Sequence, residues 1–65
     1  MKIKAFDERN DIEKEIEASS VKEIAEKMNI NLEQVIIIKN NELITENSEI
    51  KDKDEIKFLS VISGG

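Results

Sequence analysis

Residues 56–65 read IKFLSVISGG, and this stretch decides the fold because it joins an apolar strand directly to a pair of glycines. Its isoleucine, phenylalanine, leucine and valine residues favour extended structure. Gly64 and Gly65 are the only 2 glycines of the 65-residue chain. A loose linker does not usually begin where a buried strand stops. We therefore expect a final strand over residues 56–62, followed by a flexible tail over residues 63–65 that ends in a free carboxylate.

The first part of the chain is expected to pair back on itself. Residues 1–7 alternate in polarity with the period of two that is typical of a half-buried strand, and residues 7–10 form a polar turn. Residues 11–18 alternate as well. The spacing of Ile12 and Ile16 also fits a helix, so periodicity leaves strand and helix open for this segment.

A helix is predicted to begin after Ser20. Ser20 is a good N-cap, and Glu23 three residues later completes a capping box. Asn29 is predicted to end the helix in a left-handed conformation, and Asn31 to cap a further short turn. The apolar stripe of this helix consists of Val21, Ile24, Ala25 and Met28.

The second half of the chain predicts three more strands. Residues 35–38 are an unbroken β-branched run, which is typical of an interior strand contacted on both faces. Asn40 and Asn41 form a tight turn because asparagine tolerates positive φ, and residues 42–44 form a short return strand. A polar connection with Ile50 directed toward the core then leads to the final strand.

The composition excludes several classes of function. The chain contains no cysteine and no histidine, so it lacks the usual zinc ligands, thiol nucleophile and neutral-pH general base. We therefore expect no catalytic residues and no bound metal, and a protein that is not an enzyme. The formal net charge of −5 disfavours nucleic-acid binding. No apolar run is long enough to span a bilayer, and we expect a cytoplasmic protein.

The order of these elements resembles the ubiquitin-like β-grasp fold, an α+β fold in which a mixed four- to five-stranded sheet packs on one helix in the order β-β-α-β-β-β. More narrowly, the chain resembles the small sulfur carriers of the ThiS and MoaD type and the archaeal small ubiquitin-like modifiers. Three stretches carry the resemblance: Lys-Asn-Asn-Glu-Leu at 39–43, Asp-Lys-Asp-Glu-Ile at 52–56, and Val-Ile-Ser-Gly-Gly at 61–65. The resemblance implies a β-grasp domain over residues 1–62.

Two positions depart from the family pattern. Lys53 replaces the usual turn glycine, which predicts either a turn without positive φ or a strained one. The Pro-Pro that commonly precedes the tail of MoaD-like carriers is absent, and Leu59 and Ser60 stand in its place. The second departure favours ThiS-like carriers or modifiers. Neither departure touches the terminal glycines.

The resemblance implies that the carboxylate of Gly65 is the reactive centre. In family members an ATP-dependent activating enzyme converts this carboxylate to an acyl-adenylate, and a sulfur donor displaces AMP to leave a thiocarboxylate. ATP is then used by the enzyme, and the carrier needs no permanently bound cofactor. Ser63 and Gly64 would thread the enzyme's channel, since three extended residues span about 10 Å and glycine has no Cβ.

The resemblance also implies the kinds of partner. They are an adenylating enzyme related to ubiquitin-activating enzymes, a sulfur donor such as a cysteine desulfurase or a rhodanese, and a sulfur-accepting synthase. The sulfur would serve thiamine or molybdopterin biosynthesis, tRNA thiolation or a related synthesis. A protein modifier that joins Gly65 to target lysines by isopeptide bonds is the alternative. A plain interaction domain with incidental glycines is a third reading.

Strand alternation predicts where the activating enzyme docks. If residues 56 and 58 face the helix, and residues 36 and 38 do so too, the odd positions of both strands face outward. A slip of one residue would exchange the two faces of a strand, and a homodimer contact could cover the same residues. The expected docking patch consists of Phe6, Val35, Ile37, Leu59 and Val61.

Overall fold

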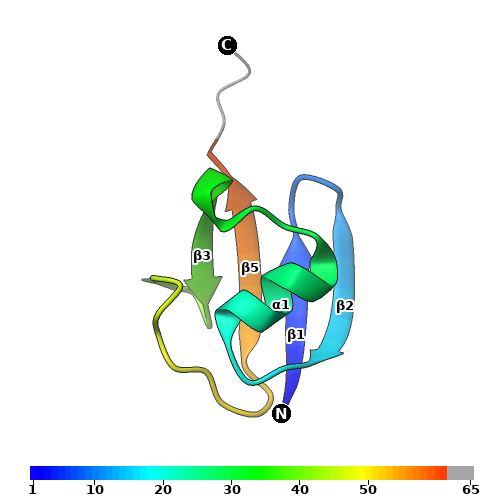
Figure 1. The fold of residues 1–65 in the computed structure, drawn as a ribbon, viewed down its shortest axis with the longest axis vertical. Coiled ribbons are helices and arrows are strands. Elements are labelled where there is room, and N and C mark those ends of the chain that lie inside the picture. The colour runs from blue at the N-terminus through cyan, green and yellow to red at the C-terminus, as the bar shows by residue number, and fades with distance from the viewer. Residues whose placement is uncertain (62–65) are drawn as a thin grey trace.

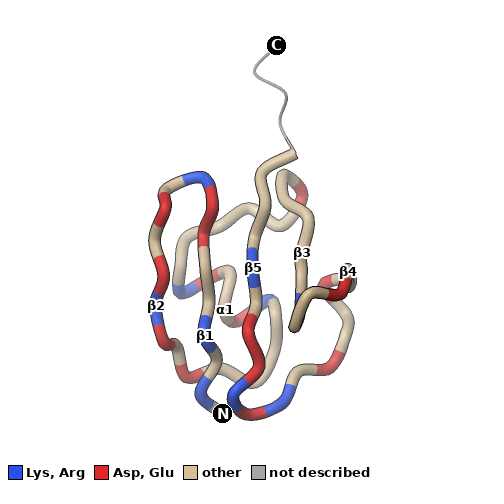
Figure 2. The backbone as a smooth tube through the Cα atoms, turned by 180° about the vertical axis from the view of Figure 1, so that it is seen from behind, with Lys and Arg blue, Asp and Glu red and all other residues tan. Residues whose placement is uncertain are grey.

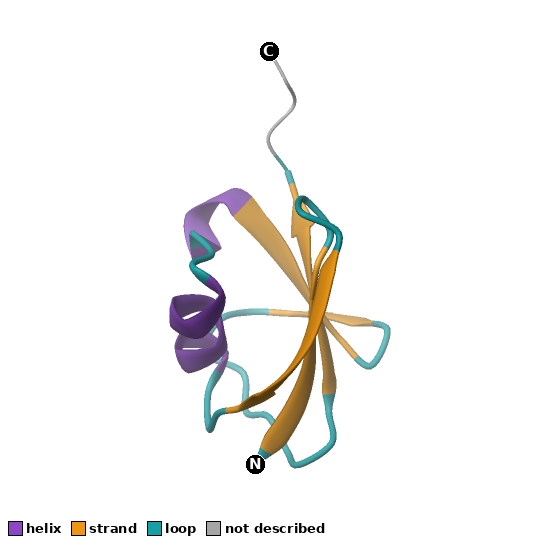
Figure 3. Ribbon diagram, turned by 90° about the vertical axis from the view of Figure 1, so that its right-hand side faces the viewer, coloured by secondary structure: helices purple, strands orange, loops and turns teal. Residues whose placement is uncertain are grey.

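A mixed sheet with one helix across one face makes up the computed structural model, which describes residues 1–61 (Figures 1 and 3). The elements are β1 (Lys2–Asp7), β2 (Ile12–Glu17), α1 (Val21–Met28), the 3-10 turn η1 (Leu32–Gln34), β3 (Val35–Lys39), β4 (Glu42–Ile44) and β5 (Glu55–Ser60). The five strands lie in the order β2-β1-β5-β3-β4. β1 and β5 are parallel in the centre, and the other neighbours are antiparallel. The expected α+β architecture of the β-grasp type is confirmed.

The segment that periodicity left open is a strand. β2 pairs with β1 in a register that sets Ile16 opposite Ile3 and Lys14 opposite Ala5. Ile16 and the following Ala18 are buried in the core, whereas Ile12 at the other end of the strand is exposed. Pairing with β1 therefore decides the conformation of a segment whose local sequence suits either state.

The helix begins and ends at the predicted residues. The Ser20 hydroxyl accepts a hydrogen bond from the Glu23 N–H over 3.1 Å. The Glu23 carboxylate accepts from the N–H of Ser19 over 2.8 Å and from its hydroxyl, so the second half of the capping box reaches one residue further back than expected. Asn29 ends the helix with φ 59° and ψ 44°, and the Ile30 N–H donates to the Ala25 carbonyl over 2.8 Å.

The core lies between α1 and the inner face of the sheet, which we define as the face toward the helix. Phe58 is its largest fully buried side chain. Ile50, in the connection after β4, is also buried, as predicted. Burying a side chain of this size stabilises the fold by about 1.5 to 3 kcal/mol. The buried apolar cluster consists of Ile3, Ala5, Ile16, Ala18, Val21, Ile24, Ile37, Ile50, Ile56 and Phe58.

The turn between β3 and β4 also positions β5. Asn40 and Asn41 have φ values of 49° and 70°, which fits a two-residue hairpin turn with the twist of its strands. The Asn40 side chain donates to the Asp54 carboxylate and accepts from the Glu55 N–H, both over 3.0 Å. One asparagine therefore fixes its own turn and the start of the final strand.

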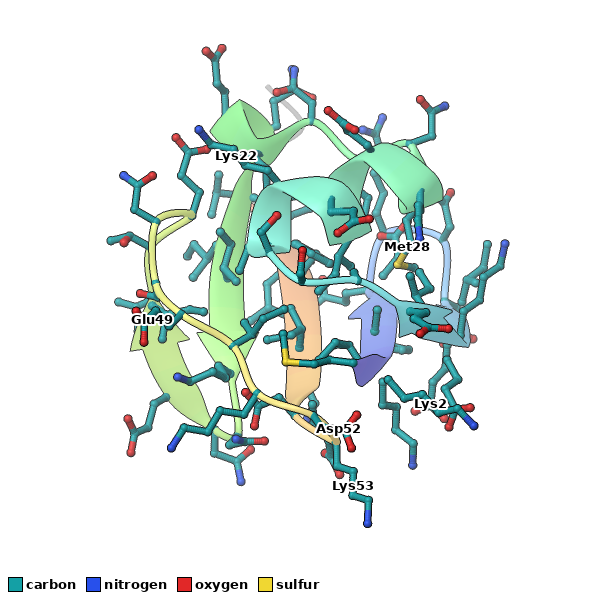
Figure 4. The ribbon with its side chains drawn as sticks, turned by 60° about the horizontal axis from the view of Figure 1, so that its bottom comes forward. Lys2, Lys22, Met28, Glu49, Asp52 and Lys53 are labelled. Atoms are coloured by element: carbon teal, nitrogen blue, oxygen red, sulfur yellow. The ribbon has the colours of Figure 1, made fainter. Side chains whose placement is uncertain are left out.

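The turn before β5 adopts positive φ without a glycine. Lys53 has φ 70°, so of the two predicted outcomes the strained one holds. Its N–H donates to the Lys2 carbonyl over 2.7 Å, and the Asp52 carboxylate accepts from the Lys2 N–H over 2.6 Å. The Lys53 side chain points away from the body (Figure 4). These two contacts with the backbone of Lys2 hold the left-handed conformation.

The final strand is shorter than predicted. β5 begins at Glu55 and ends at Ser60, and Val61 follows it outside the strand. The predicted end of the strand at Ile62 lies outside the described residues, as do the tail residues Ser63, Gly64 and Gly65. Neither helical segment of residues 1–61 is long and apolar enough to cross a membrane.

Candidate functional site

The last described residues are fixed by the middle of the sheet. β5 pairs with β1 on one side and with β3 on the other, and Ser60 lies opposite Val35. One residue later, the Val61 N–H donates to the Gln34 carbonyl over 3.2 Å. The chain therefore leaves the body from a strand that is held on both edges.

The predicted orientation of β3 is wrong by one residue. Ile37 is only 5% exposed and belongs to the core, whereas Ile36 is 38% exposed. Ile37 lies opposite the buried Phe58, and residues that lie opposite each other in an antiparallel pair share a face of the sheet. Residues 35–38 are all apolar, so their sequence has no alternation that could show which of them face the core.

Two residues of the predicted docking patch therefore do not belong to the outer face. Ile37 is buried in the core, and Val35 is half-buried and packs against the core. Phe6 and Leu59 are half-buried, and Val61 is 48% exposed. Phe6 is the cross-strand neighbour of the exposed Lys57, on the face opposite the helix.

The register brings other apolar residues to the outer face in their place. Ile36 lies opposite Leu59, Ile38 opposite Lys57, and Leu43 of β4 opposite Ile38. Leu43 is 71% exposed. Sequence alternation missed these three residues, and only the pairing of β3 with β5 and with β4 reveals them. The resulting outer patch consists of Phe6, Ile36, Ile38, Leu43, Leu59 and Val61.

Charge divides the outer face into two halves. β2 presents Glu13, Glu15 and Glu17 opposite Phe6, Lys4 and Lys2 of β1. Toward β3 the charged residues of this face are Lys57, which lies between Phe6 and Ile38, and Glu55 at the start of β5, and its other residues are apolar (Figure 2). The apolar half borders the base of the tail, and a surface of this kind is typical of a protein-binding site.

The buried acids have structural partners. The Asp7 carboxylate accepts from the Arg9 N–H over 3.0 Å and from the Asn10 amide over 2.8 Å. Burial tends to raise the pKa of Asp54, but the Asn40 amide, the Lys51 N–H and the nearby lysines outweigh it and hold this pKa below its ordinary value. Within residues 1–61 no cluster of three or more acidic side chains is arranged to hold a metal ion.

Known proteins are similar to this chain in sequence and in fold. The model of the ThiS family matches residues 2–65. The sulfur carrier protein TtuB of Thermus thermophilus is 34% identical over 55 residues, which cover 80% of this chain and 85% of TtuB. A solved complex of subunits 1 and 2 of the molybdopterin-converting factor from Helicobacter pylori 26695 contains a chain that superposes with a TM-score of 0.77 at 24% identity, with all of both chains covered. At that identity the superposition shows a common fold.

Proposed function

The chain belongs to the ThiS family, as the resemblance predicted, and we propose that it is a sulfur carrier whose carboxylate on Gly65 is adenylated and then converted to a thiocarboxylate. The match of the family model over residues 2–65, which includes both glycines, carries this proposal. The similarity to the sulfur carrier protein TtuB over four-fifths of the chain supports the same role.

The chemistry follows from the weakness of a carboxylate as an acyl donor. A carboxylate oxygen of Gly65 attacks the α-phosphorus of ATP on a partner enzyme, and pyrophosphate leaves. The terminal sulfur of a persulfide on a sulfur donor protein then attacks the acyl carbon, the bond to the AMP oxygen breaks, and AMP leaves an acyl disulfide between the two proteins. A second thiol attacks the donor's sulfur in this disulfide, which releases the thiocarboxylate and leaves the two thiol sulfurs joined as a disulfide. The 65 residues contain no cysteine, so the sulfur is bonded to the carboxyl carbon and not to a side chain.

The outer patch is the surface on which we expect the adenylating enzyme to dock. Its residues belong to β1, β3, β4 and β5, and Val61 joins it to the base of the tail. Docking there would hold the sheet rigidly while the tail enters the active site of the enzyme. A rigid body and a short tail together fix the distance at which the carboxylate meets ATP.

Intact-mass spectrometry tests the proposal. The purified chain is incubated with ATP, with the adenylating enzyme of its own organism, and with either its cysteine desulfurase and cysteine or its rhodanese and thiosulfate, in the presence of dithiothreitol as the thiol reductant. We expect a species that is heavier than the unmodified chain by the difference between a sulfur and an oxygen atom. Omission of ATP abolishes this species.

A variant without Gly65 is the matched control. It keeps every described residue, so its fold is unchanged, and we expect no gain in mass. A wild-type chain that never gains the sulfur with all components present would overturn the proposal. Lysines of other proteins that carry the C-terminal residues of this chain, in place of a sulfur-bearing species, would favour the modifier function.

A further inference from the structure

An apolar groove lies where β4 leaves β3. It has a volume of about 410 Å³, and its walls come from η1, β3, β4 and the first residues of the following connection. Leu32, Val35 and Ile44 also pack against the core, while Ile36 and Leu43 belong to the outer patch. The groove therefore runs over the edge of the sheet from one face to the other.

Part of the β3 backbone is unpaired along this groove. β4 has three residues and pairs with residues 37–39 only, so the first two residues of β3 extend beyond it. The Gln34 carbonyl accepts from Val61, and the Asn40 N–H donates to Glu55, so even-numbered residues of this stretch direct their backbone groups toward β5.

In an antiparallel strand the intervening residues direct their backbone groups to the other side. Ile37 and Lys39 accordingly face Ile44 and Glu42 of β4. The carbonyl of Val35 faces the same side, where the described strands provide no residue opposite it. The groove thus contains an open backbone acceptor between apolar walls, which is the pattern that an added strand recognises.

The charges of the groove select the kind of occupant. Glu46 is the one charged residue among those that line it, and the exposed Glu42 follows the turn at the end of the same hairpin. A second copy of the chain is a poor occupant because its net charge is −5 and its free edge strand β2 presents Glu13, Glu15 and Glu17. An apolar segment that carries lysine or arginine complements the groove.

We propose that this groove binds an extended segment of another protein, in which β-branched apolar residues are flanked by lysine or arginine, by adding a strand to the open edge of β3. A backbone N–H of the segment donates to the Val35 carbonyl, its apolar side chains fill the groove, and its cation lies beside Glu46. This binding does not require Gly65, so it is independent of the proposed sulfur chemistry.

Peptide titration monitored by NMR of the ¹⁵N-labelled chain tests the proposal. The probe is an acetylated, amidated peptide in which Val-Ile-Val-Thr is flanked by lysines. We expect the largest amide shift changes at residues 34–37 and 43–46. The same peptide with N-methylated central amides cannot donate to Val35, and we expect it to lose binding. The variant without Gly65 binds the probe as the wild type does.

Glu46→Lys and Glu49→Lys form a matched pair, because both invert one charge in the same connection and only Glu46 lines the groove. Figure 4 locates Glu49 in this connection. We expect Glu46→Lys to weaken the probe about two- to fivefold at low salt, as the loss of one exposed ion pair does, and Glu49→Lys to change it less.

Three results would overturn the proposal. They are equal binding of the N-methylated peptide, equal effects of the two glutamate variants, and shift changes centred on Phe6 and Lys57 instead of the groove. Dimerisation of the free chain through the β3 edge, seen by analytical ultracentrifugation, would show that a second copy is the occupant.

Discussion

The two faces of the sheet are made from alternate residues of the same strands, yet they differ in what covers them. On the inner face, Ile3, Ala5, Ile56 and Phe58 are completely buried beneath α1. On the outer face, the neighbouring residues of these strands stay exposed or half-buried. The residues of each strand that face the helix therefore determine stability, whereas the alternate residues, which face outward, are available for binding. Substitutions at adjacent positions can therefore separate folding from function.

The largest contrast is expected at adjacent isoleucines of β3. Ile37→Asp would place a carboxylate in the core, at a cost of several kcal/mol. A chain of 65 residues has about 3 to 10 kcal/mol of stability, so we expect this variant to be unfolded. Ile36→Asp places the same group on the outer face and should remain folded. Circular dichroism and the dispersion of NMR amide signals distinguish the two.

The folded Ile36→Asp variant also tests whether the outer patch binds the activating enzyme. Folded Ile36→Asp should form acyl-adenylate much more slowly with the activating enzyme, because a carboxylate would lie in the centre of the apolar contact. Pyrophosphate release measures this rate. Equal folding of the Ile36→Asp and Ile37→Asp variants would mean that the register of β3 differs from the one described.

A smaller contrast is expected at adjacent residues of β5. Phe58→Ala removes the largest fully buried side chain and should lower the free energy of unfolding by about 3 to 5 kcal/mol. Leu59→Ala, on the outer face, should lower it by about 1 kcal/mol because that side chain is only half-buried. Urea unfolding monitored by far-ultraviolet circular dichroism provides both values. Similar losses for the two variants would contradict the assignment of the faces.

Much of the fold could be predicted because local chemistry marks its boundaries. The Ser20 hydroxyl caps α1 and Asn29 ends it, as the sequence of these positions predicts. Asn40 and Asn41 adopt the positive φ values that their side chains tolerate. Each of these signals acts within a few residues, and the surrounding structure does not need to be known.

Two features could not be predicted because they depend on partners distant in the sequence. They are which residues of β3 face the core and whether residues 11–18 form a strand or a helix. Ile36 and Ile37 are chemically identical, and only the position of Phe58 opposite Ile37 decides which of them is buried. The strand state of β2 likewise depends on its pairing with β1. The candidate site was consequently predicted in part: Phe6, Leu59 and Val61 lie on or beside the outer face, while Val35 and Ile37 pack inward.

The smallest contrast concerns pH and lies at the start of β5. Asp54 lies two residues before Ile56 and is buried like it, whereas the adjacent Glu55 is exposed. The pKa of Asp54 is lower in the folded chain than the ordinary value, so the unfolded state takes up its proton first as the pH falls. The stability that this carboxylate contributes is therefore complete above about pH 4, the unfolded pKa, and is lost as the pH falls through the folded pKa.

Asp54→Asn should consequently be less stable than the wild type at pH 7, and the difference between their urea midpoints should shrink as the pH is lowered from 6 to well below the ordinary pKa of an aspartate. Glu55→Gln removes the same charge from the outward-facing neighbour while its N–H keeps the bond to Asn40. This variant controls for the change in net charge. A gap between Asp54→Asn and the wild type that stays constant over this range would mean that Asp54 acts through its shape and hydrogen bonds, not through its ionisation. A difference that disappears at low pH would show that ionisation of the buried Asp54 carboxylate causes part of the acid sensitivity of the fold.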